Sequence, residues 1–126
     1  MEFEYNMKYV LITGGTSGIG FAMAGEFLER GYGVILASSS RKNLAIAKRK
    51  LEVKKSKIVK STRYIITIEQ DLSVEGGEER LYHKAKTLGV DIEILVNNAG
   101  FGLTGGTESI NIKDDKKMIQ LIVTAP

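Results

Sequence analysis

Two kinds of segment alternate along this chain. Short continuous apolar runs, of which Tyr9–Thr13 is the first, are typical of strands that are buried on both faces of a sheet. Between them lie segments with apolar residues three or four positions apart, which is the spacing of an amphipathic helix. The expected strands cover residues 9–13, 34–37, 64–68 and 92–96. The expected helices cover residues 18–30, a basic stretch for which Ser38–Ser40 offer N-cap hydroxyls, residues 74–88 and residues 113–124.

The regular succession of strand and helix predicts the fold class. Parallel strands need a crossover between them, and a right-handed helical crossover is the usual solution. We therefore expect an α/β fold with a parallel sheet and helices on both of its faces. Residues 1–126 are expected to form a single domain, because this length is typical of one domain.

The composition is that of an ordinary globular protein, with 43% apolar and 26% charged residues. There are no cysteines, which excludes disulfide bonds and thiol chemistry. No apolar run approaches the roughly 18 residues that a membrane span requires. The segment Met1–Tyr5 is acidic where a secretory signal would be basic. We therefore expect a soluble cytoplasmic protein with no membrane partner.

The net charge of +3 hides a strongly basic block. Between Arg41 and Arg63 there are ten lysines and arginines and one acid, Glu52. Such a block is compatible with nucleic-acid or phosphate binding, and equally with the solvated face of a helix. The block has no interleaved aromatic residues and overlaps one amphipathic helix, so we favour the solvated face and expect no nucleic-acid partner.

A glycine-rich turn connects the first strand to the first helix. The segment Thr13–Gly20 reads Thr-Gly-Gly-Thr-Ser-Gly-Ile-Gly, with the important glycines at 14, 18 and 20. One glycine allows a sharp turn, one allows the backbone to approach a pyrophosphate, and one allows the helix to pack on the sheet. The N-terminus of the helix then offers free N–H groups to phosphate oxygens. By itself this pattern is also compatible with a tight structural turn.

Two further motifs accompany the turn. Asp71–Leu72 follows the third expected strand, and Asn97–Gly100, which reads Asn-Asn-Ala-Gly, follows the fourth. With the turn at 13–20, these motifs have the order and spacing of the short-chain dehydrogenase/reductase family, which the sequence resembles from about residue 8 onward. Residues 90–102 look especially similar to a bacterial branch of broad-specificity reductases. The resemblance implies a three-layer α/β/α Rossmann-type domain with a partial parallel sheet of four strands, in the order 3-2-1-4.

The resemblance also implies an oxidoreductase acting on carbonyl or alcohol substrates with a nicotinamide dinucleotide. Asp71 would accept a hydrogen bond from the adenine amino group, with the Leu72 backbone beside it, and Asn97 would brace the central strand. An acid at this position is also favoured simply by the dipole of the helix that follows it. The pyrophosphate turn would comprise Gly14, Thr16, Ser17, Gly18, Ile19 and Gly20. The adenine ribose would be lined by Asn98, Ala99 and Gly100.

The end of the second strand indicates which cofactor is preferred. An acid there would bind the ribose 2′-hydroxyl and repel a 2′-phosphate, but this chain has Ser38 and Ser39, with Arg41 close behind. Small hydroxyl side chains leave room for a phosphate and the cation neutralises it, so NADP(H) is favoured over NAD(H). One departure is that Ser39 stands where the family usually has an arginine, so that Arg41 would have to reach back.

The catalytic residues of the family have no counterpart in the printed sequence. The resemblance implies a serine and a Tyr-x-x-x-Lys pair several tens of residues after Asn97–Gly100; there the tyrosine protonates the carbonyl and the lysine lowers its pKa. No tyrosine follows residue 100, and Ile122 stands where the family pattern has the asparagine of the proton relay. We therefore expect no catalytic residue in these 126 residues.

Tyr82 and Lys86 match the residue types and spacing of Tyr-x-x-x-Lys but not its place in the chain. They precede the fourth strand, whereas the family's pair follows it, and at positions i and i+4 they simply share one face of a helix. His83 between them has no acid or second histidine spaced to support it, and no spacing in the chain predicts a metal site.

Two interpretations stay open. The chain is a truncated reductase that keeps the cofactor-binding half and is inactive as it stands, or it is a non-catalytic nucleotide-binding or interaction module. Either way, a fourth strand without a fifth beside it would be an exposed edge, and the helix expected at 113–124 would lack neighbours. The sequence therefore predicts a homodimer or a higher self-association.

Overall fold

The computed structural model describes residues 7–54, 65–98, 112–113 and 118–123. Strands and helices alternate along the chain up to the fourth strand, and two further strands follow. In chain order the elements are β1 (Lys8–Thr13), α1 (Gly18–Glu29), β2 (Gly33–Ser38), α2 (Arg41–Lys54), β3 (Ile65–Glu69), α3 (Gly77–Lys86), β4 (Asp91–Asn97), β5 (Ile112–Lys113) and β6 (Met118–Val123).

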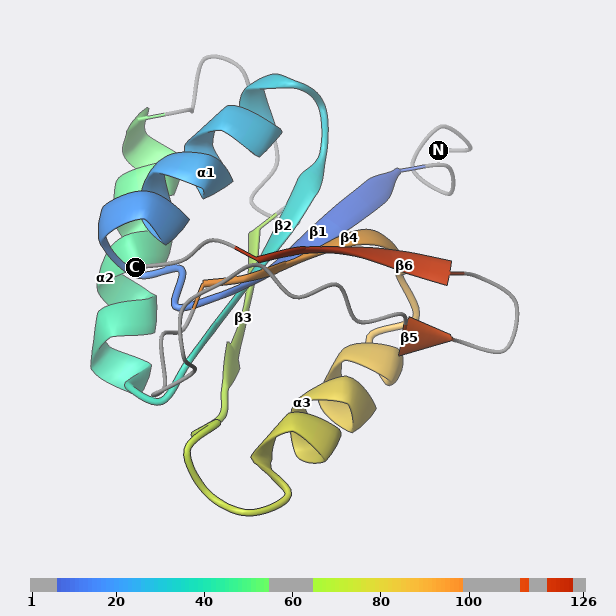
Figure 1. The fold of residues 1–126 in the computed structure, drawn as a ribbon. Coiled ribbons are helices and arrows are strands. Elements are labelled where there is room, and N and C mark those ends of the chain that lie inside the picture. The colour runs from blue at the N-terminus through green and yellow to red at the C-terminus, as the bar shows by residue number, and fades with distance from the viewer. Residues whose placement is uncertain (1–6, 55–64, 99–111, 114–117, 124–126) are drawn as a thin grey trace.

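The strands form one sheet in the order β3-β2-β1-β4-β6-β5. Every neighbouring pair runs parallel except β5 and β6, which are antiparallel. The predicted order 3-2-1-4 of the first four strands is therefore confirmed. Figure 1 shows α1 and α2 together on one side of the sheet and α3 on the other, which confirms the α/β/α layering.

Alternate residues of β1 serve the two layers. Val10 and Ile12 belong to the buried cluster beneath α1 and α2, whereas Tyr9 and Leu11 belong to the cluster beneath α3. All four are at most 8% exposed. A strand that is buried on both faces has no polar side, which explains why β1 appears in the sequence as a continuous apolar run.

The prediction of a helix at residues 113–124 is wrong over the described residues of that range, 113 and 118–123. Met118–Val123 is strand β6, which runs parallel to β4, with Ile94 opposite Gln120 and Asn97 opposite Val123. The segment Met-Ile-Gln-Leu-Ile-Val is rich in apolar and branched residues, which suit a strand as well as one face of a helix. Pairing also satisfies the backbone N–H and C=O groups along the open side of β4.

The same pairing corrects the expectation that the fourth strand is an edge. β4 lies between β1 and β6, so its backbone is paired on both sides. Ile122, which the sequence placed on a helix, lies on β6 opposite Val96. The outer strands of the sheet are β3 and β5. β4 therefore offers no open edge for self-association.

Helix α3 begins at Gly77, three residues later than expected. Gly76 has φ 78°, the left-handed region that glycine adopts most readily, and it ends the preceding turn. A Cβ on Gly77 would overlap the carbonyl oxygen of Asp71, so this glycine allows the helix to start against the loop after β3. The close approach places Asp71 at the carboxyl edge of the sheet.

Candidate dinucleotide site

The turn after β1 depends on two glycines with left-handed backbone. Gly14 has φ 64° and Gly18 has φ 59°. The Gly14 N–H donates to the Ala37 carbonyl oxygen at 3.0 Å, which ties the turn to the end of β2. A Cβ on Gly18 would meet no atom within 4 Å. Gly18 is therefore required for its backbone conformation, and the space in front of it is open to a ligand.

Gly20 serves a different purpose, which is close packing. A Cβ there would overlap the Gly14 carbonyl oxygen and would lie 2.7 Å from Nδ2 of Asn98. The absence of a side chain thus lets the first turn of α1 pack directly against the turn after β1 and against the end of β4. Gly14 and Gly18 thus provide the left-handed backbone of the turn, and Gly20 allows the close packing of the helix.

The N-terminus of α1 faces the same open side. Ser17 is the N-cap residue with extended backbone, and its side chain makes no capping hydrogen bond. Thr16 is half-buried, and Ile19 is a large apolar side chain that is 55% exposed. N–H groups in the first turn of a helix lack partners within the helix, and together with its dipole they attract anions.

The ends of β1 and β4 are joined by a hydrogen-bonded network around Thr13. The buried Thr13 hydroxyl donates to Oδ1 of Asn97 at 3.0 Å and accepts from the Asn98 N–H at 2.9 Å. Asn98 in turn donates from Nδ2 to the Gly14 carbonyl oxygen at 3.2 Å. The structure therefore brings two motifs more than eighty residues apart into direct contact. In the sequence the only sign of this role of Thr13 is a hydroxyl at the end of an apolar run.

The end of β2 is organised by serine hydroxyls. The Ser40 N–H donates to Oγ of Ser38 at 3.2 Å, and the Asn43 N–H donates to Oγ of Ser40 at 3.1 Å. The second of these bonds is the cap at the start of α2, as the sequence predicted. Ser39 is exposed between them. The loop is therefore compact, with small side chains at its surface.

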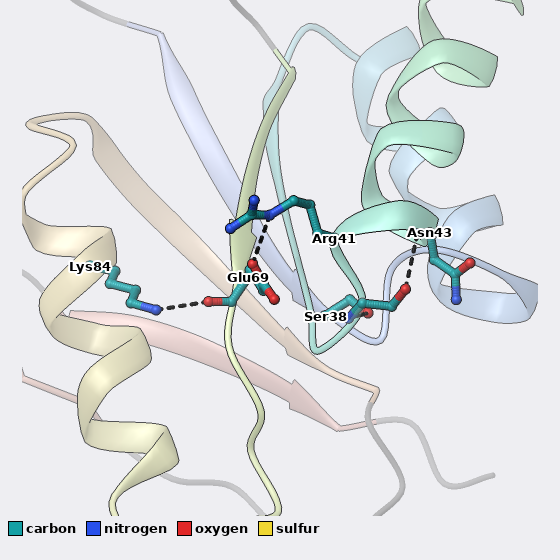
Figure 2. Close-up of polar contacts among 6 residues, drawn as sticks. Ser38, Arg41, Asn43, Glu69 and Lys84 are labelled. Atoms are coloured by element: carbon teal, nitrogen blue, oxygen red, sulfur yellow. Dashed lines mark hydrogen bonds and ion pairs between the residues drawn. The ribbon is translucent and has the colours of Figure 1, made fainter.

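Arg41 does not turn back toward this loop. Its Nε donates a hydrogen bond of 3.1 Å to Oε1 of Glu69, the last residue of β3. Figure 2 shows the guanidinium pointing to that carboxylate. Lys84 of α3 donates to the main-chain oxygen of the same residue at 2.8 Å. Glu69 is opposite Ser38 in the parallel pairing of β2 and β3. Nothing in the local sequence signals that Glu69 would lie beside Ser38, so Glu69 could not be predicted as part of this edge.

Asp71 presents an exposed carboxylate just beyond β3. Its Oδ1 accepts hydrogen bonds from the Ser73 hydroxyl at 2.6 Å and from the Ser73 N–H at 2.9 Å. Both bonds lower the pKa of Asp71 below its usual value, and the bond from the hydroxyl has the larger effect. The preceding residue, Gln70, donates its N–H to the Ser38 carbonyl oxygen at 2.8 Å, which connects this loop to the end of β2.

Leu72 packs its side chain against the apolar cluster beneath α3. Its backbone lies beside Gly77, whose added Cβ would meet the Leu72 Cα at 3.0 Å. The remaining two residues expected at the site, Ala99 and Gly100, lie outside the described residues. The structure thus gathers the other site residues at the carboxyl edge of parallel strands, where ligands bind in this class of fold.

Tyr82 has the wrong environment for a catalytic acid. It is half-buried on α3 beside the apolar cluster, and burial, followed by the negative charge of Glu78, raises its pKa. The family's tyrosine needs a pKa lowered toward the working pH. Among the described residues, no group of three or more His, Cys, Asp or Glu side chains could hold a metal ion. Over those same parts of the chain, no helix is both long and apolar enough to cross a membrane.

Comparison with protein families matches residues 8–126 to the short chain dehydrogenase family. This chain belongs to that family. An uncharacterised oxidoreductase of Bacillus subtilis, DltE, is 35% identical over 121 residues, which is 93% of this chain and 43% of that protein. The chain spans less than half the length of the curated relatives it matches.

Solved structures of family members resemble the fold described above. The NADP complex of RhlG from Pseudomonas aeruginosa has a TM-score of 0.63 and 29% identity, and the match covers 86% of this chain and 41% of that one. A 3-ketoacyl-(acyl-carrier-protein) reductase from Brucella melitensis, complexed with NADH, has a TM-score of 0.60 and 26% identity, covering 75% and 35%. The relatives therefore include complexes with both kinds of nicotinamide cofactor.

Proposed function

We propose that this chain is the dinucleotide-binding part of an oxidoreductase that acts on carbonyl or alcohol substrates. The observation that carries the proposal is the junction between the glycine turn and the end of β4, where Asn98 bonds to Gly14 against the bare Cα of Gly20. This junction lies at the carboxyl ends of β1 and β4, where the strand order reverses and Rossmann-type domains bind dinucleotides.

In this proposal each part of the cofactor would contact its own set of residues. The pyrophosphate would lie on the N-terminus of α1, against Gly14, Thr16, Ser17, Gly18, Ile19 and Gly20. Asp71, which is ionised at neutral pH, would accept the adenine amino group beside Leu72. The adenine ribose would pass Asn98, Ala99 and Gly100. When bound, the cofactor supplies the hydride, and the residues described here bind and orient it.

NADP(H) is the preferred cofactor in this proposal. The loop after β2 offers the small side chains Ser38 and Ser39, with the cation Arg41 at the start of α2. The first turn of α2 contains no acid of its own, and its cationic side chains would attract a 2′-phosphate. The NADP complex of the Pseudomonas aeruginosa relative supports this preference. Because the Brucella melitensis relative is complexed with NADH, the residues after β2 rather than the fold decide the choice.

A pair of glycine variants tests cofactor binding. Gly18 and Gly31 both have positive φ, and an added Cβ meets no atom within 4 Å at either position. Gly18→Ala and Gly31→Ala should therefore lose similar stability, on the order of 1 kcal/mol. Only Gly18→Ala places a methyl group where the pyrophosphate would lie. We expect calorimetry to show NADPH binding weakened at least about tenfold in Gly18→Ala and unchanged in Gly31→Ala, a difference of about 1.4 kcal/mol. Equal affinities in the two variants would contradict the proposed site.

We expect the 126-residue chain to show no carbonyl reduction by itself. No tyrosine follows residue 100 of the printed sequence, so the family's Tyr-x-x-x-Lys pair does not occur there. Tyr82, whose pKa is raised, is unsuited to replace them. The measurement is NADPH oxidation with a panel of small aldehydes and ketones. Activity that disappears in Tyr82→Phe would overturn both the expectation and the view that Tyr82 has no catalytic role.

Cytoplasmic localisation and self-association remain proposals for this chain. The proposal of a homodimer rested on an exposed fourth strand, and the pairing of β4 with β6 removes that support. Sedimentation equilibrium at micromolar concentrations tests the proposed self-association directly. A monomer at every concentration measured would contradict it.

A further inference from the structure

The preference for a phosphorylated cofactor rests on the absence of an acid at the end of β2, yet the sheet supplies an acid there from another strand. Glu69 ends β3 and is opposite Ser38, the last residue of β2. Neighbouring strands lie about 4.8 Å apart, so the main chains of these two residues are immediate neighbours. Glu69 is exposed, and its carboxylate lies on the solvent side of this edge.

The Glu69 carboxylate engages the cation on which the phosphate argument depends. Oε1 of Glu69 lies 3.1 Å from Nε of Arg41, and Figure 2 shows that the arginine extends from α2 across to β3. On the other side of the strand, Lys84 donates to the main-chain oxygen of Glu69 at 2.8 Å. Glu69 is thus held between α2 and α3, and Arg41 is directed toward it.

We propose that Glu69 is a specificity-determining residue that reduces the preference of this chain for NADP(H) over NAD(H). This inference rests on the proposed function, because it concerns the same cofactor site. Two effects act in the same direction. The carboxylate competes with the 2′-phosphate for Arg41, and its negative charge repels the phosphate at the end of β2. NAD(H) carries no 2′-phosphate, so its binding is insensitive to both effects.

The exposure of the pair sets the size of the effect. The Arg41 side chain is 87% exposed and the Glu69 side chain 46% exposed, so water and salt screen their attraction. A 2′-phosphate carries up to about two negative charges and can displace such a carboxylate. Glu69 therefore reduces the affinity for NADPH without preventing binding. We expect its removal to change that affinity about three- to tenfold.

The experiment is a titration of the 126-residue chain with NADPH and with NADH at low salt. Glu69→Gln keeps the shape of the side chain and removes its charge. The control is Glu26→Gln, because Glu26 forms a similarly exposed ion pair with Arg30 at the far end of α1. We expect Glu69→Gln to bind NADPH about three- to tenfold more tightly and NADH within about twofold of the unsubstituted chain. Glu26→Gln should change neither affinity by more than about twofold.

A double-mutant cycle isolates the part of the effect that acts through Arg41. Arg41→Gln should weaken NADPH binding, and in that background the gain from Glu69→Gln should shrink, because no guanidinium remains to be released. Raising the salt concentration should shrink it further.

The outcomes separate the two proposals. If the unsubstituted chain binds both cofactors and Glu69→Gln leaves the ratio of their affinities unchanged, the inference about Glu69 is wrong and the proposed function stands. A gain of equal size for NADPH and NADH also overturns it, because the effect would then not concern the 2′-phosphate. If neither cofactor binds to the chain at millimolar concentration, the proposed function fails, and the inference fails with it.

Discussion

Two neighbouring regions at the carboxyl edge of the sheet are built in opposite ways. Around Thr13, where β1 and β4 end, hydrogen bonds of 2.9–3.2 Å link side chains and backbone that are buried or partly buried. Around Glu69, where β2 and β3 end, the polar contacts join exposed side chains to each other or to the main chain. The first region tolerates only one arrangement of its side chains, because any substitution leaves a buried or partly buried polar group without its hydrogen-bond partner. The second tolerates substitution, because water replaces any lost contact.

This difference assigns different tasks to the two regions. A rigid turn and a close helix N-terminus are needed for any dinucleotide, phosphorylated or not. The choice between the two cofactors requires only a local change of charge, which an exposed edge can provide without disturbing the core. We therefore expect substitutions around Thr13 to affect folding and binding together, and substitutions around Glu69 to affect selectivity alone.

The largest stability effect should come from Thr13. Thr13→Val keeps the volume but removes the hydroxyl that bonds Asn97 and Asn98, at a position only 3% exposed. We expect a loss of about 1–3 kcal/mol in the free energy of unfolding, because partly buried partners lose their hydrogen bonds. Urea denaturation measures it. The matched control is Thr87→Val, which removes an exposed hydroxyl bond to the Lys84 carbonyl oxygen, and which should cost at most about 0.5 kcal/mol. Equal losses in both variants would contradict the contrast between the regions.

A smaller effect is expected at the exposed edge. Arg41→Gln breaks the ion pair with Glu69. Because both side chains are substantially exposed, the free energy of unfolding should change by less than about 1 kcal/mol, while the affinity for NADPH falls. The same denaturation experiment checks the first part and calorimetry the second. A loss of stability as large as that of Thr13→Val would show that the edge is a structural element after all.

The smallest effect concerns pH. Hydrogen bonds from Ser73 lower the pKa of Asp71 in the folded chain, so its carboxylate stabilises the fold above the ordinary pKa of the unfolded chain. That contribution is lost as the pH falls through the unfolded and then the folded value. We expect Asp71→Asn to shift the urea midpoint downward at pH 6 and to differ less from the unsubstituted chain at pH 3. In Ser73→Ala the pH-dependent difference should shrink, because the hydroxyl is the main cause of the lowered pKa.

Much of the fold could be predicted because its signals are local. The apolar runs of β1 and β2 and the amphipathic pattern of α2 match the structure to within a few residues. The segment 113–124 was misassigned because an apolar stretch of this length suits a strand or a helix face equally well. Only the open side of β4, which is a property of the assembled sheet, favours the strand.

In the candidate site too, features that depend on local sequence could be predicted, whereas those that depend on strand pairing could not. The sequence by itself determined that Gly14 and Gly18 form a sharp turn and that Ser40 caps α2, because these features depend on neighbouring residues along the chain. Only the tertiary structure decided that Thr13 would hold Asn98, and that Glu69 would lie beside Ser38 and take Arg41. The physical reason is that strand pairing brings together groups far apart in sequence, and their charges and hydrogen bonds acquire meaning only through that proximity.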